Sequence, residues 1–415
     1  MQTFNELYEN TLNSVLHPNE HPDIRNMDSF VPEQLDCLLN PKKHPLIIRT
    51  DRCTCAKDSQ AECLKKCPFD ALYLTEEGVT VNPDLCMGCS ECIDGCSSEK
   101  LKATTDIIPA LKAVRESKAL TYAMIAPAFL GQFTSQVTPG QLRTAMQEVG
   151  FDGMVEVAIC ADILTLKEAL EFDHNIKNQQ DFQLTSCCCP MWVGMIRKKY
   201  TELIGHVPGS VSPMVACGRV IKALHPEALT VFIGPCLAKK AEARQPDIAD
   251  AVDYVLTFEE MKNIFEALGI DPAAMPDKKR NHSSRAGIIY ARTGGVSEAV
   301  ASTVKALDPD NPIEIKTKQA DGIPACKQMI QNILDGKIDA NFYEGMGCVG
   351  GCVGGPKALL NAKEGTHLVN EYGEKAHYKH PAENPYVIEL LNQVGLPSID
   401  SLIHEPNMFD RNLTE

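Results

Sequence analysis

The chain has 415 residues and a mass of 45.5 kDa, enough for two or three domains. With 44% hydrophobic and 23% charged residues it can form a sizeable core, which excludes a chain disordered by composition. The formal net charge of −15 argues against a nucleic-acid partner, and no apolar run is long enough to span a membrane, so we expect a cytoplasmic protein.

The chain divides into three segments of different character. Residues 1–45 are polar and contain several prolines, which predicts an extended or partly helical N-terminal arm. Residues 46–105 hold eight cysteines and little periodic apolar pattern, which predicts a small domain held together by metal. Residues 106–415 form the third and largest predicted domain.

Short apolar runs alternate with amphipathic segments beyond residue 118. The runs predict buried strands at Leu120–Ile125, Met154–Ile159, Ala228–Ile233 and Gly287–Tyr290. The amphipathic segments predict helices that include Gln141–Val149, Leu164–Phe172 and Phe258–Leu268. This alternation is typical of an α/β fold with parallel sheets.

Cysteine is the most unusual feature of the composition. The chain has 18 cysteines, and most of them are grouped at short spacings. In a reducing compartment such groups are typical of metal or iron–sulfur ligands rather than of disulfides. Four cysteines stand apart from any cluster pattern and are predicted to fill the core: Cys37, Cys160, Cys217 and Cys326.

Eight of the cysteines form two tandem runs like those of bacterial ferredoxins. The second run, Cys86–Cys96, has the spacing C-x₂-C-x₂-C-x₃-C, in which three cysteines bind one [4Fe–4S] cluster and the fourth binds its neighbour. The first run, Cys53–Cys67, ends in Cys-Pro but begins with C-x-C and a seven-residue gap. The crossover rule predicts two ligand sets: Cys67, Cys86, Cys89 and Cys92, and Cys53, Cys55, Cys63 and Cys96. A pair of zinc knuckles is the alternative.

Three further cysteine motifs lie far apart in the rest of the chain. They read TSCCCPMW at 185–192, GPCLAKKAE at 234–242 and EGMGCVGGCVGG at 344–355. Each places cysteine beside glycine or proline, where the backbone can turn tightly around a cluster. Together they supply at least four thiolates, enough for one more [4Fe–4S] cluster.

These three motifs, in this order, resemble those of the [FeFe]-hydrogenases. The resemblance extends from about residue 50 to the C-terminus, with further matches at Ile125–Ala128, Thr293–Ala299, Asn384-Pro385 and Leu402–His404. The CCCP and GCVGGCVGGP forms are similar to the group B branch of that family. The resemblance implies a two-lobed α/β catalytic domain with parallel sheets flanked by helices, preceded by a small α+β ferredoxin-like domain.

The resemblance also implies an activity and its cofactors. The chain would catalyse 2H⁺ + 2e⁻ = H₂ at an H-cluster, a [4Fe–4S] cluster bridged to a diiron unit that carries CO, CN⁻ and a dithiolate bridge. Two accessory [4Fe–4S] clusters would carry electrons to it. By resemblance, the cubane of the H-cluster would be held by Cys189, Cys236, Cys348 and Cys352, with Cys352 also bridging to the diiron unit.

Other residues of the motifs would surround the diiron unit. Cyanide is anionic, so a buried ammonium or backbone N–H would hold it by a charge-assisted bond. Lys239 matches the lysine that donates to one cyanide, Pro127 and Ala128 match the loop that contacts the other, and Met346 would line the pocket. Lys239 with Glu242 could also be a plain ion pair at a helix start, and Glu242 is retained as a candidate site residue.

Proton transfer to such a site needs acidic groups that lead to the surface. Cys188 occupies the family's proton-delivering position, although an alignment that starts from Thr-Ser would make Cys187 a ligand. Glu168 and Glu171 lie i, i+3 on one helix face and align with the family's two relay glutamates; as plain surface charges they would have no such role. The family's next relay residue, a serine, aligns with Pro208, which cannot relay a proton.

Ser210, Ser212 or water would then have to replace the missing hydroxyl. Three more positions depart from the family pattern: Gly234, Met214 and Arg292. We expect these changes to alter the packing and polarity of the diiron pocket.

The implied partners are a small electron carrier, a ferredoxin or a flavodoxin, and the hydrogenase maturation proteins. Such carriers are acidic, so a local basic patch is needed near the clusters, and Lys57, Lys65 and Lys66 are candidates for it. No nucleic-acid or membrane partner is expected.

Two other functions compete with the enzyme. One is a hydrogenase-like iron–sulfur scaffold without a diiron site, and the other is a hydrogen sensor. Cys188, Lys239 and the Pro127–Ala128 loop favour the enzyme, because a scaffold has no use for cyanide contacts or a proton shuttle. Sensors typically replace the shuttle cysteine and add a signalling domain, and neither feature is seen in this sequence.

Overall fold

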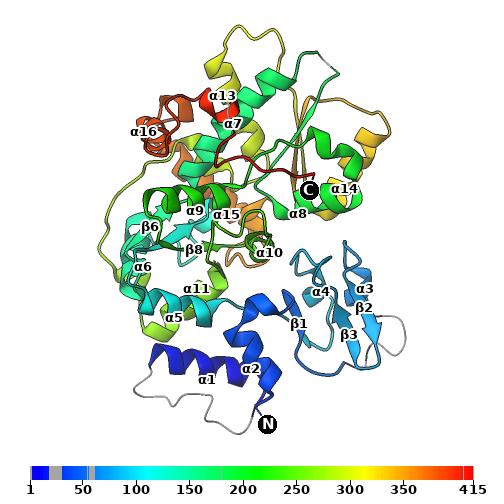
Figure 1. Cartoon of the computed structure of the whole chain (residues 1–415), viewed down its shortest axis with the longest axis vertical. Helices are drawn as coiled ribbons and strands as arrows, with labels where there is room; N and C mark the ends of the chain where they lie inside the picture. Colours follow the sequence, from blue (N-terminus) through cyan, green and yellow to red (C-terminus); the bar gives the residue numbers. More distant parts are fainter. Residues whose placement is uncertain are drawn as a thin grey trace.

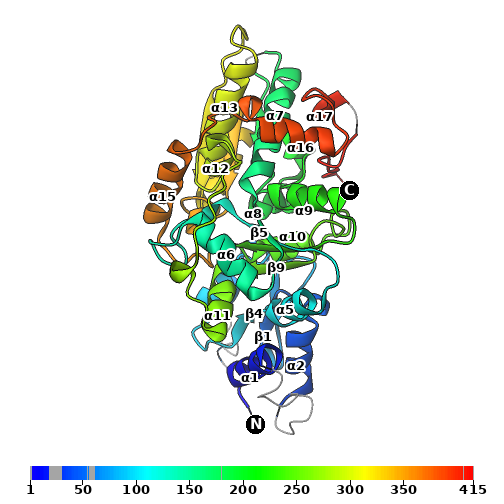
Figure 2. The same ribbon diagram turned by 90° about the vertical axis from the view of Figure 1, so that its left-hand side faces the viewer.

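The computed structural model describes residues 2–17, 30–53, 55, 61–178, 180–404 and 406–414. Lys57, a candidate for the basic patch, lies outside these residues. The molecule is elongated, with the N-terminal helices at one end and a small lobe of strands beside them (Figures 1 and 2). No helix in the described ranges is both long enough and apolar enough to cross a membrane.

The N-terminal arm is helical and packs against the body of the protein. α1 (Phe4–Leu16) contacts α2 (Pro32–Leu39) and also α5 (Ile107–Glu116). Leu7 and Leu38 lose nearly all their solvent exposure at these contacts. Apolar burial of this kind attaches the arm, so it is not an extended tail in the described ranges.

Residues 46–105 form the small lobe. Its elements are two antiparallel strand pairs and two single-turn helices: β1 (Ile47–Arg49) with β4 (Leu101–Ala103), β2 (Leu72–Thr75) with β3 (Gly78–Val81), α3 (Glu62–Lys65) and α4 (Glu91–Asp94). Four of the nine buried residues in its core are cysteines. Because so little apolar surface is buried, bound clusters would contribute much of the stability of this lobe.

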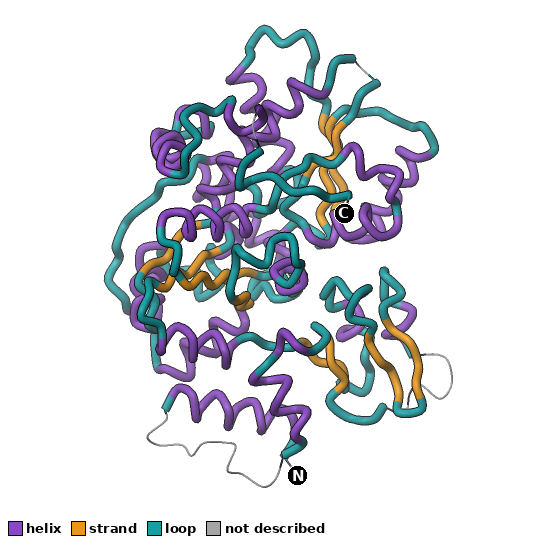
Figure 3. The backbone as a smooth tube through the Cα atoms, viewed as in Figure 1, coloured by secondary structure: helices purple, strands orange, loops and turns teal. Residues whose placement is uncertain are grey.

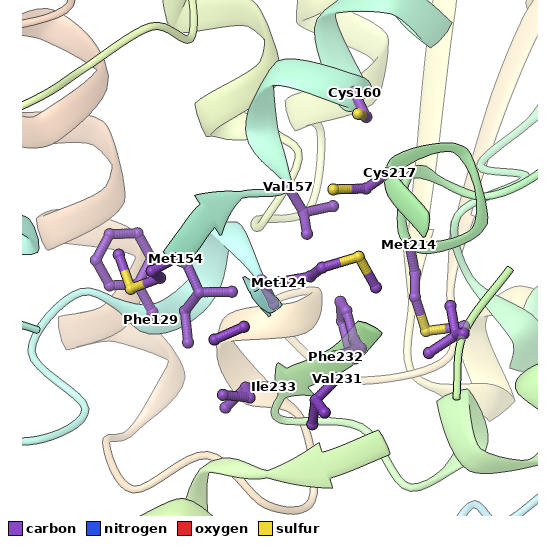
Figure 4. Packing of buried hydrophobic residues seen from close by; sticks show 14 of the residues in the cluster. Met124, Phe129, Met154, Val157, Cys160, Met214, Cys217, Val231, Phe232 and Ile233 are labelled. Atoms are coloured by element: carbon purple, nitrogen blue, oxygen red, sulfur yellow. The ribbon is translucent and has the colours of Figure 1, made fainter. Parts of the chain in front are cut away.

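The larger of two parallel sheets forms the centre of the molecule. Its strand order is β6–β5–β8–β9, with bounds β5 (Thr121–Ile125), β6 (Gly153–Glu156), β8 (Leu229–Gly234) and β9 (Tyr254–Thr257). It is packed by α5 and by three further helices: α6 (Pro139–Val149), α9 (Pro213–Leu224) and α11 (Phe258–Leu268). Figure 4 shows the core at this sheet, where Met124 of β5 and Phe232 of β8 lie among buried side chains.

The second parallel sheet has three strands in the order β10–β11–β7. In Figure 3 these strands are the orange group beside the C-terminus, apart from the strands of the larger sheet. Its bounds are β7 (Gln183–Thr185), β10 (Thr317–Asp321) and β11 (Phe342–Met346). The helices that contact it are α8 (Pro190–Lys199), α13 (Gly295–Leu307) and α14 (Ile323–Leu334).

Helix α7 (Ala158–Asn175) joins the two sheets. It packs against α9 on one side and against α12 (Arg285–Ile289) and α13 on the other, and most of its residues are buried. Four more helices complete the described chain: α10 (Ala238–Ala243), α15 (Ala362–Glu374), α16 (Pro385–Gln393) and α17 (Ser401–His404).

The predicted α/β fold with parallel sheets flanked by helices is confirmed. The predicted strand at Gly287–Tyr290 is wrong, because these residues belong to helix α12 and its end. A short apolar run cannot distinguish a buried strand from a buried helix, and α12 is buried between α7, α13 and α15. The strand predicted at Met154–Ile159 ends at Glu156, after which α7 begins.

The four cysteines predicted as core residues are all buried: Cys37, Cys160, Cys217 and Cys326. Cys160 and Cys217 lie in the core of the larger sheet (Figure 4). All eighteen cysteines are free thiols.

Candidate functional site

The first cysteine motif turns from a strand into a helix. β7 ends at Thr185, and α8 begins at Pro190, a residue that suits the first position of a helix. Between them Ser186 has a φ of +71°, which is costly for a residue with a Cβ, and Cys189 caps the helix. The strained turn places three consecutive cysteines at the carboxyl end of β7.

The second and third motifs also follow strands. Cys236 comes directly after β8 and before α10, and Cys348 comes directly after β11. The chain then turns through Gly351, whose φ is +86° and whose added Cβ would lie 2.6 Å from the backbone nitrogen of Thr293. Only glycine fits there, and the turn leads Cys352 back toward the other motifs. The site therefore lies where the carboxyl ends of strands from both sheets meet.

Four thiols from these motifs converge. Burial and the other thiols of the set raise the pKa of Cys236 to about 11 and that of Cys352 to about 12. Burial also raises the pKa of Cys348, with smaller contributions from Cys236 and Cys189. The backbone N–H of Gly347 donates to the Sγ of Cys189 at 3.3 Å. The structure thus brings together all four predicted cubane ligands.

The chemistry of this donor set fits an iron–sulfur cluster. Four soft sulfur donors from three separate turns can surround a cubane, and the Gly347 N–H is aimed at one sulfur. Within the described ranges, no three Cys, His, Asp or Glu side chains are arranged to chelate a single metal ion. Because thiolates are the ligands, the raised pKa values mean that cluster binding must release protons.

Lys239 lies beside these thiols as a buried cation. Its Nζ donates to Glu242 at 2.6 Å, and both side chains are almost fully buried. Burial opposes the charged form, but Glu242, Cys188 and Cys236 together raise the pKa of Lys239. The ammonium therefore keeps its charge inside the protein, and Glu242 holds it in place. A solvated surface pair, the alternative interpretation of Lys239 and Glu242, is excluded by this burial.

The loop after β5 approaches the same region. Pro127 begins a short 3₁₀ helix, Pro127–Phe129, in which Ala128 is buried. The N–H of Ala126 donates to the carbonyl of Ile233 at 2.9 Å, which holds this loop against the strand that leads to Cys236. Met346, also buried, ends β11 just before Cys348.

The departures from the family pattern have local structural explanations. A Cβ at Gly234 would lie 2.7 Å from the Cε1 of Phe232, so the ring of Phe232 fills the space that a side chain at 234 would take. Met214 is buried in the adjoining core (Figure 4). The guanidinium of Arg292 pairs with Glu298 and Asn370, while its backbone packs on Gly351.

The buried carboxyl of Glu168 contacts Cys187. The Sγ of Cys187 donates to the Oε1 of Glu168 at 3.2 Å, and Thr185 donates to the other oxygen. Burial, together with the charge of Glu171, raises the pKa of Glu168 to about 7. Cys189 is among the thiols that raise the pKa values of Cys236, Cys348 and Cys352, which favours it over Cys187 as the ligand of the first motif. The role of Cys187 as a contact of Glu168 was missed by sequence reasoning, which considered it only as a ligand.

Cys188 is a half-buried thiol near the candidate ligands. Burial raises the pKa of this thiol well above its usual value, with further contributions from Cys352 and Cys189, while Lys239 lowers it. Glu168 also acts on Cys188 electrostatically. The structure thus places Cys188 near both the predicted ligands and the first predicted relay acid.

Glu171 and the serines show where the predicted proton path changes. Glu171 pairs with Lys167, and its Oε2 is buried without a hydrogen-bond partner. Ser212 is occupied as the N-cap of α9, where it accepts from Val215. Ser210 has a buried Oγ that lacks a partner. Lys167 was not predicted, although its i, i+4 spacing to Glu171 on a helix could have indicated the pair.

The pKa shifts of the small-lobe cysteines arise mainly within the two predicted groups, although Cys63 also acts on Cys92. Cys67 and Cys86 act on Cys89, a half-buried thiol whose pKa is raised, chiefly by desolvation, to about 12. All three of these cysteines act on Cys92. In the other group, the pKa of Cys63 is raised by burial and then by its three companions: Cys96, Cys55 and Cys53. Cys89 also contributes to the raised pKa of Cys348, so the first group faces the candidate site.

Comparison with known proteins gives a consistent family match. Residues 119–356, more than half of the chain, match the family model of the iron only hydrogenase large subunit, C-terminal domain. The match includes all three cysteine motifs of the larger domain.

Curated relatives of two kinds are similar to the chain. The periplasmic [Fe] hydrogenase large subunit of Nitratidesulfovibrio vulgaris is 28% identical over 293 residues, which cover 59% of this chain and 70% of that protein. Iron hydrogenase 1 of Clostridium pasteurianum is 28% identical over 58% of this chain, which spans about half, 49%, of that relative. A probable cytosolic Fe-S cluster assembly factor of Drosophila persimilis is 20% identical over 72% of this chain and 77% of its own length.

Solved structures share the fold. A variant of the [FeFe]-hydrogenase HydA1 from Chlamydomonas reinhardtii superposes with a TM-score of 0.60 at 19% identity, covering 74% of this chain and 98% of that one. A structure described as showing stepwise [FeFe]-hydrogenase H-cluster assembly gives 0.59 at 21% identity, covering 69% and 94%.

Proposed function

Because the chain belongs to the iron-only hydrogenase family, we propose that it is an [FeFe]-hydrogenase, of the group B branch, that interconverts protons, electrons and H₂. One observation carries the proposal: four distant thiols converge beside a buried ammonium and a further thiol. The H-cluster, when bound, supplies the iron at which H₂ is formed or split. The cytoplasm, where free thiols persist, is the proposed location.

The protein's own residues would hold the cofactor by two kinds of contact. Cys189, Cys236, Cys348 and Cys352 would provide the thiolates of the cubane, and Cys352 would also reach the diiron unit. Lys239 keeps N–H groups free after its bond to Glu242 and could donate one to a cyanide. The Pro127–Ala128 loop would offer backbone contacts on another side, and Met346 would exclude water from the pocket.

Protons would move between Glu168 and the diiron unit through Cys188. The burial that raises the pKa of Glu168 to about 7 makes this acid able to gain and lose a proton near neutral pH. Glu168 lies within electrostatic range of Cys188, and Glu171 lies one helical turn further from it. This order gives a path of carboxyl and thiol groups from the interior toward the surface.

The small lobe would act as a ferredoxin-like electron wire with two [4Fe–4S] clusters. The group of Cys67, Cys86, Cys89 and Cys92 would be the inner cluster, since Cys89 faces Cys348. The group of Cys53, Cys55, Cys63 and Cys96 would be the outer one, open to a ferredoxin or flavodoxin. Exposed Lys66 is a candidate for guiding an acidic carrier, while Lys65 pairs with Glu62.

Replacing Cys89 by alanine tests the wire. We expect hydrogen evolution driven by a reduced ferredoxin to fall much more than evolution driven by a small reduced dye, because a dye can approach the inner site directly. The same two assays on Cys37→Ala, which removes a buried thiol from the N-terminal arm, should show no such difference. Equal losses in both assays of Cys89→Ala would argue against the wire.

Infrared spectroscopy tests the main proposal. The protein is matured with hydrogenase maturation proteins and measured under H₂ and under CO. We expect bands from iron-bound CO and CN⁻ that shift between the two gases. If complete maturation gives no such bands while the chain still binds [4Fe–4S] clusters, the scaffold function is the better one, and the similarity to the Drosophila assembly factors would then be the more informative match.

A further inference from the structure

A solvent cavity lies against the buried end of the proton path. It has a volume of about 580 Å³ and is lined on one side by α8 and on the other by the C-terminal tail. Its wall includes Cys187, which donates to Glu168, and also Ser210 and Asp410. Water in this cavity is therefore separated from Glu168 by the side chain of Cys187.

The C-terminal tail is held over helix α7 by backbone pairing. The N–H of Val211 donates to the carbonyl of Phe409 at 2.9 Å, and the N–H of Arg411 donates to the carbonyl of Gly209 at 2.9 Å. These bonds form an antiparallel bridge between Ser210 and Asp410. In Figure 1 the tail runs past α8 to the C-terminus. The position of Asp410 is thus set by the fold.

Asp410 and Glu171 share one buried ammonium. The Nζ of Lys167 lies 3.1 Å from the Oδ1 of Asp410 and also pairs with the Oε1 of Glu171. Lys167 is 4% exposed, while Asp410 is 38% exposed and faces the solvent. The other oxygen of Asp410 accepts from the N–H of Asn407, which fixes the orientation of the carboxylate.

Two polar atoms near this chain of groups have no partner. They are the Oε2 of Glu171 and the Oγ of Ser210, both buried. Buried polar atoms are normally satisfied, so ordered water is expected at both. The position where the family has a serine is Pro208, and its carbonyl only accepts from the N–H of Ser210.

We propose that Asp410 is the entrance for protons in this chain, and that Lys167 is a positioning residue that keeps Asp410 and Glu171 together in place of the missing serine. The proposal rests on the hydrogenase function proposed above. The Asp410 carboxylate takes a proton from bulk water, and the proton moves through ordered water to the Oε2 of Glu171 and on to Glu168. Asp410 is then ionised again, and the ammonium of Lys167 keeps its protons throughout.

The test uses hydrogen–deuterium exchange of the Glu168 carboxyl in the protein without its diiron unit. At about pH 6, below the pKa of about 7, most of Glu168 is protonated, so its C=O stretch appears in the infrared spectrum. The band is assigned by its loss in Glu168→Gln. Its shift after rapid transfer to D₂O measures how fast protons reach the buried acid.

We expect Asp410→Asn and Lys167→Met to slow this exchange at least about a hundredfold, the low end of what a positioned proton-transfer group contributes. Lys167→Arg, which keeps the charge, should retain most of the rate. Asp250→Asn is the control, because Asp250 pairs with Arg219, which binds the tail at the carbonyls of Met408 and Asp410 but does not touch Lys167. Its exchange should be unchanged.

Matured variants give a second readout. Asp410→Asn should lower turnover and enlarge the solvent isotope effect while the CO and CN⁻ bands stay as in the parent. Unchanged exchange and unchanged turnover in both Asp410→Asn and Lys167→Met would overturn the proposal. Exchange does not need the diiron unit, so absent CO and CN⁻ bands would refute the hydrogenase function without deciding this path.

Discussion

Replacing Cys188 by alanine is expected to lower hydrogen evolution and uptake by about 10²–10⁴-fold, the usual contribution of a positioned proton-transfer group. Cys352, Lys239 and Glu168 all lie close enough to Cys188 to act on it electrostatically, so its thiol is well placed to bridge cofactor and acid. The measurement is the rate of H₂ formation from a reduced dye, after maturation. The CO and CN⁻ bands should remain, because alanine removes no ligand.

A matched control separates proton transfer from the loss of any buried thiol. Cys217→Ala makes the same chemical change on α9, at a fully buried thiol that packs in the core of the larger sheet. We expect it to keep the parental turnover, with at most a lower stability from the small cavity. If Cys188→Ala keeps the parental turnover too, another group delivers the proton, and Cys187 is the first to examine.

The parts of the site that depend on local sequence were predictable. Cys189, Cys236 and Cys348 each sit in a turn that directly follows a strand, and the glycines and prolines that allow those turns are adjacent in sequence. The convergence of the three motifs depends on the three-dimensional fold. Because parallel strands bring their carboxyl ends together, motifs that each follow a strand are nevertheless expected to lie close to one another. The ion pair of Lys239 with Glu242, three residues apart at the start of one short helix, was also predictable from the sequence.

The parts that depend on distant packing were not predictable. The apolar run Gly287–Tyr290 suits a buried strand as well as a buried helix, and only its packing between helices distinguishes the two. Asp410 has no signal in sequence, because its place over Lys167 comes from backbone bonds between the tail and residues 209–211. Arg292 has its guanidinium turned to Glu298 and away from the site, which sequence position alone could not reveal.

Replacing Cys189 by alanine is expected to abolish both the cubane of the catalytic domain and all hydrogen turnover. Its sulfur accepts from Gly347 and is among the thiols that raise the pKa of Cys236 and Cys352, so its loss leaves the cubane with three protein ligands. Iron and acid-labile sulfide analysis should show the loss of one [4Fe–4S] cluster per chain relative to the parent. The CO and CN⁻ bands should also be absent, because the diiron unit would have no cubane to bridge to.

Cys187→Ala, two residues away, is the matched control for this loss. Cys187 donates to Glu168, whereas Cys189 acts on the other three candidate ligands, so removal of Cys187 should leave the iron and sulfide content at the parental value. Loss of the cluster in Cys187→Ala with retention in Cys189→Ala would mean that the motif must be aligned from Thr185 and not from Pro190. In that case Cys187 would hold iron in place of Cys189, and the assignment of Cys188 as the proton-delivering thiol would have to be revised with it.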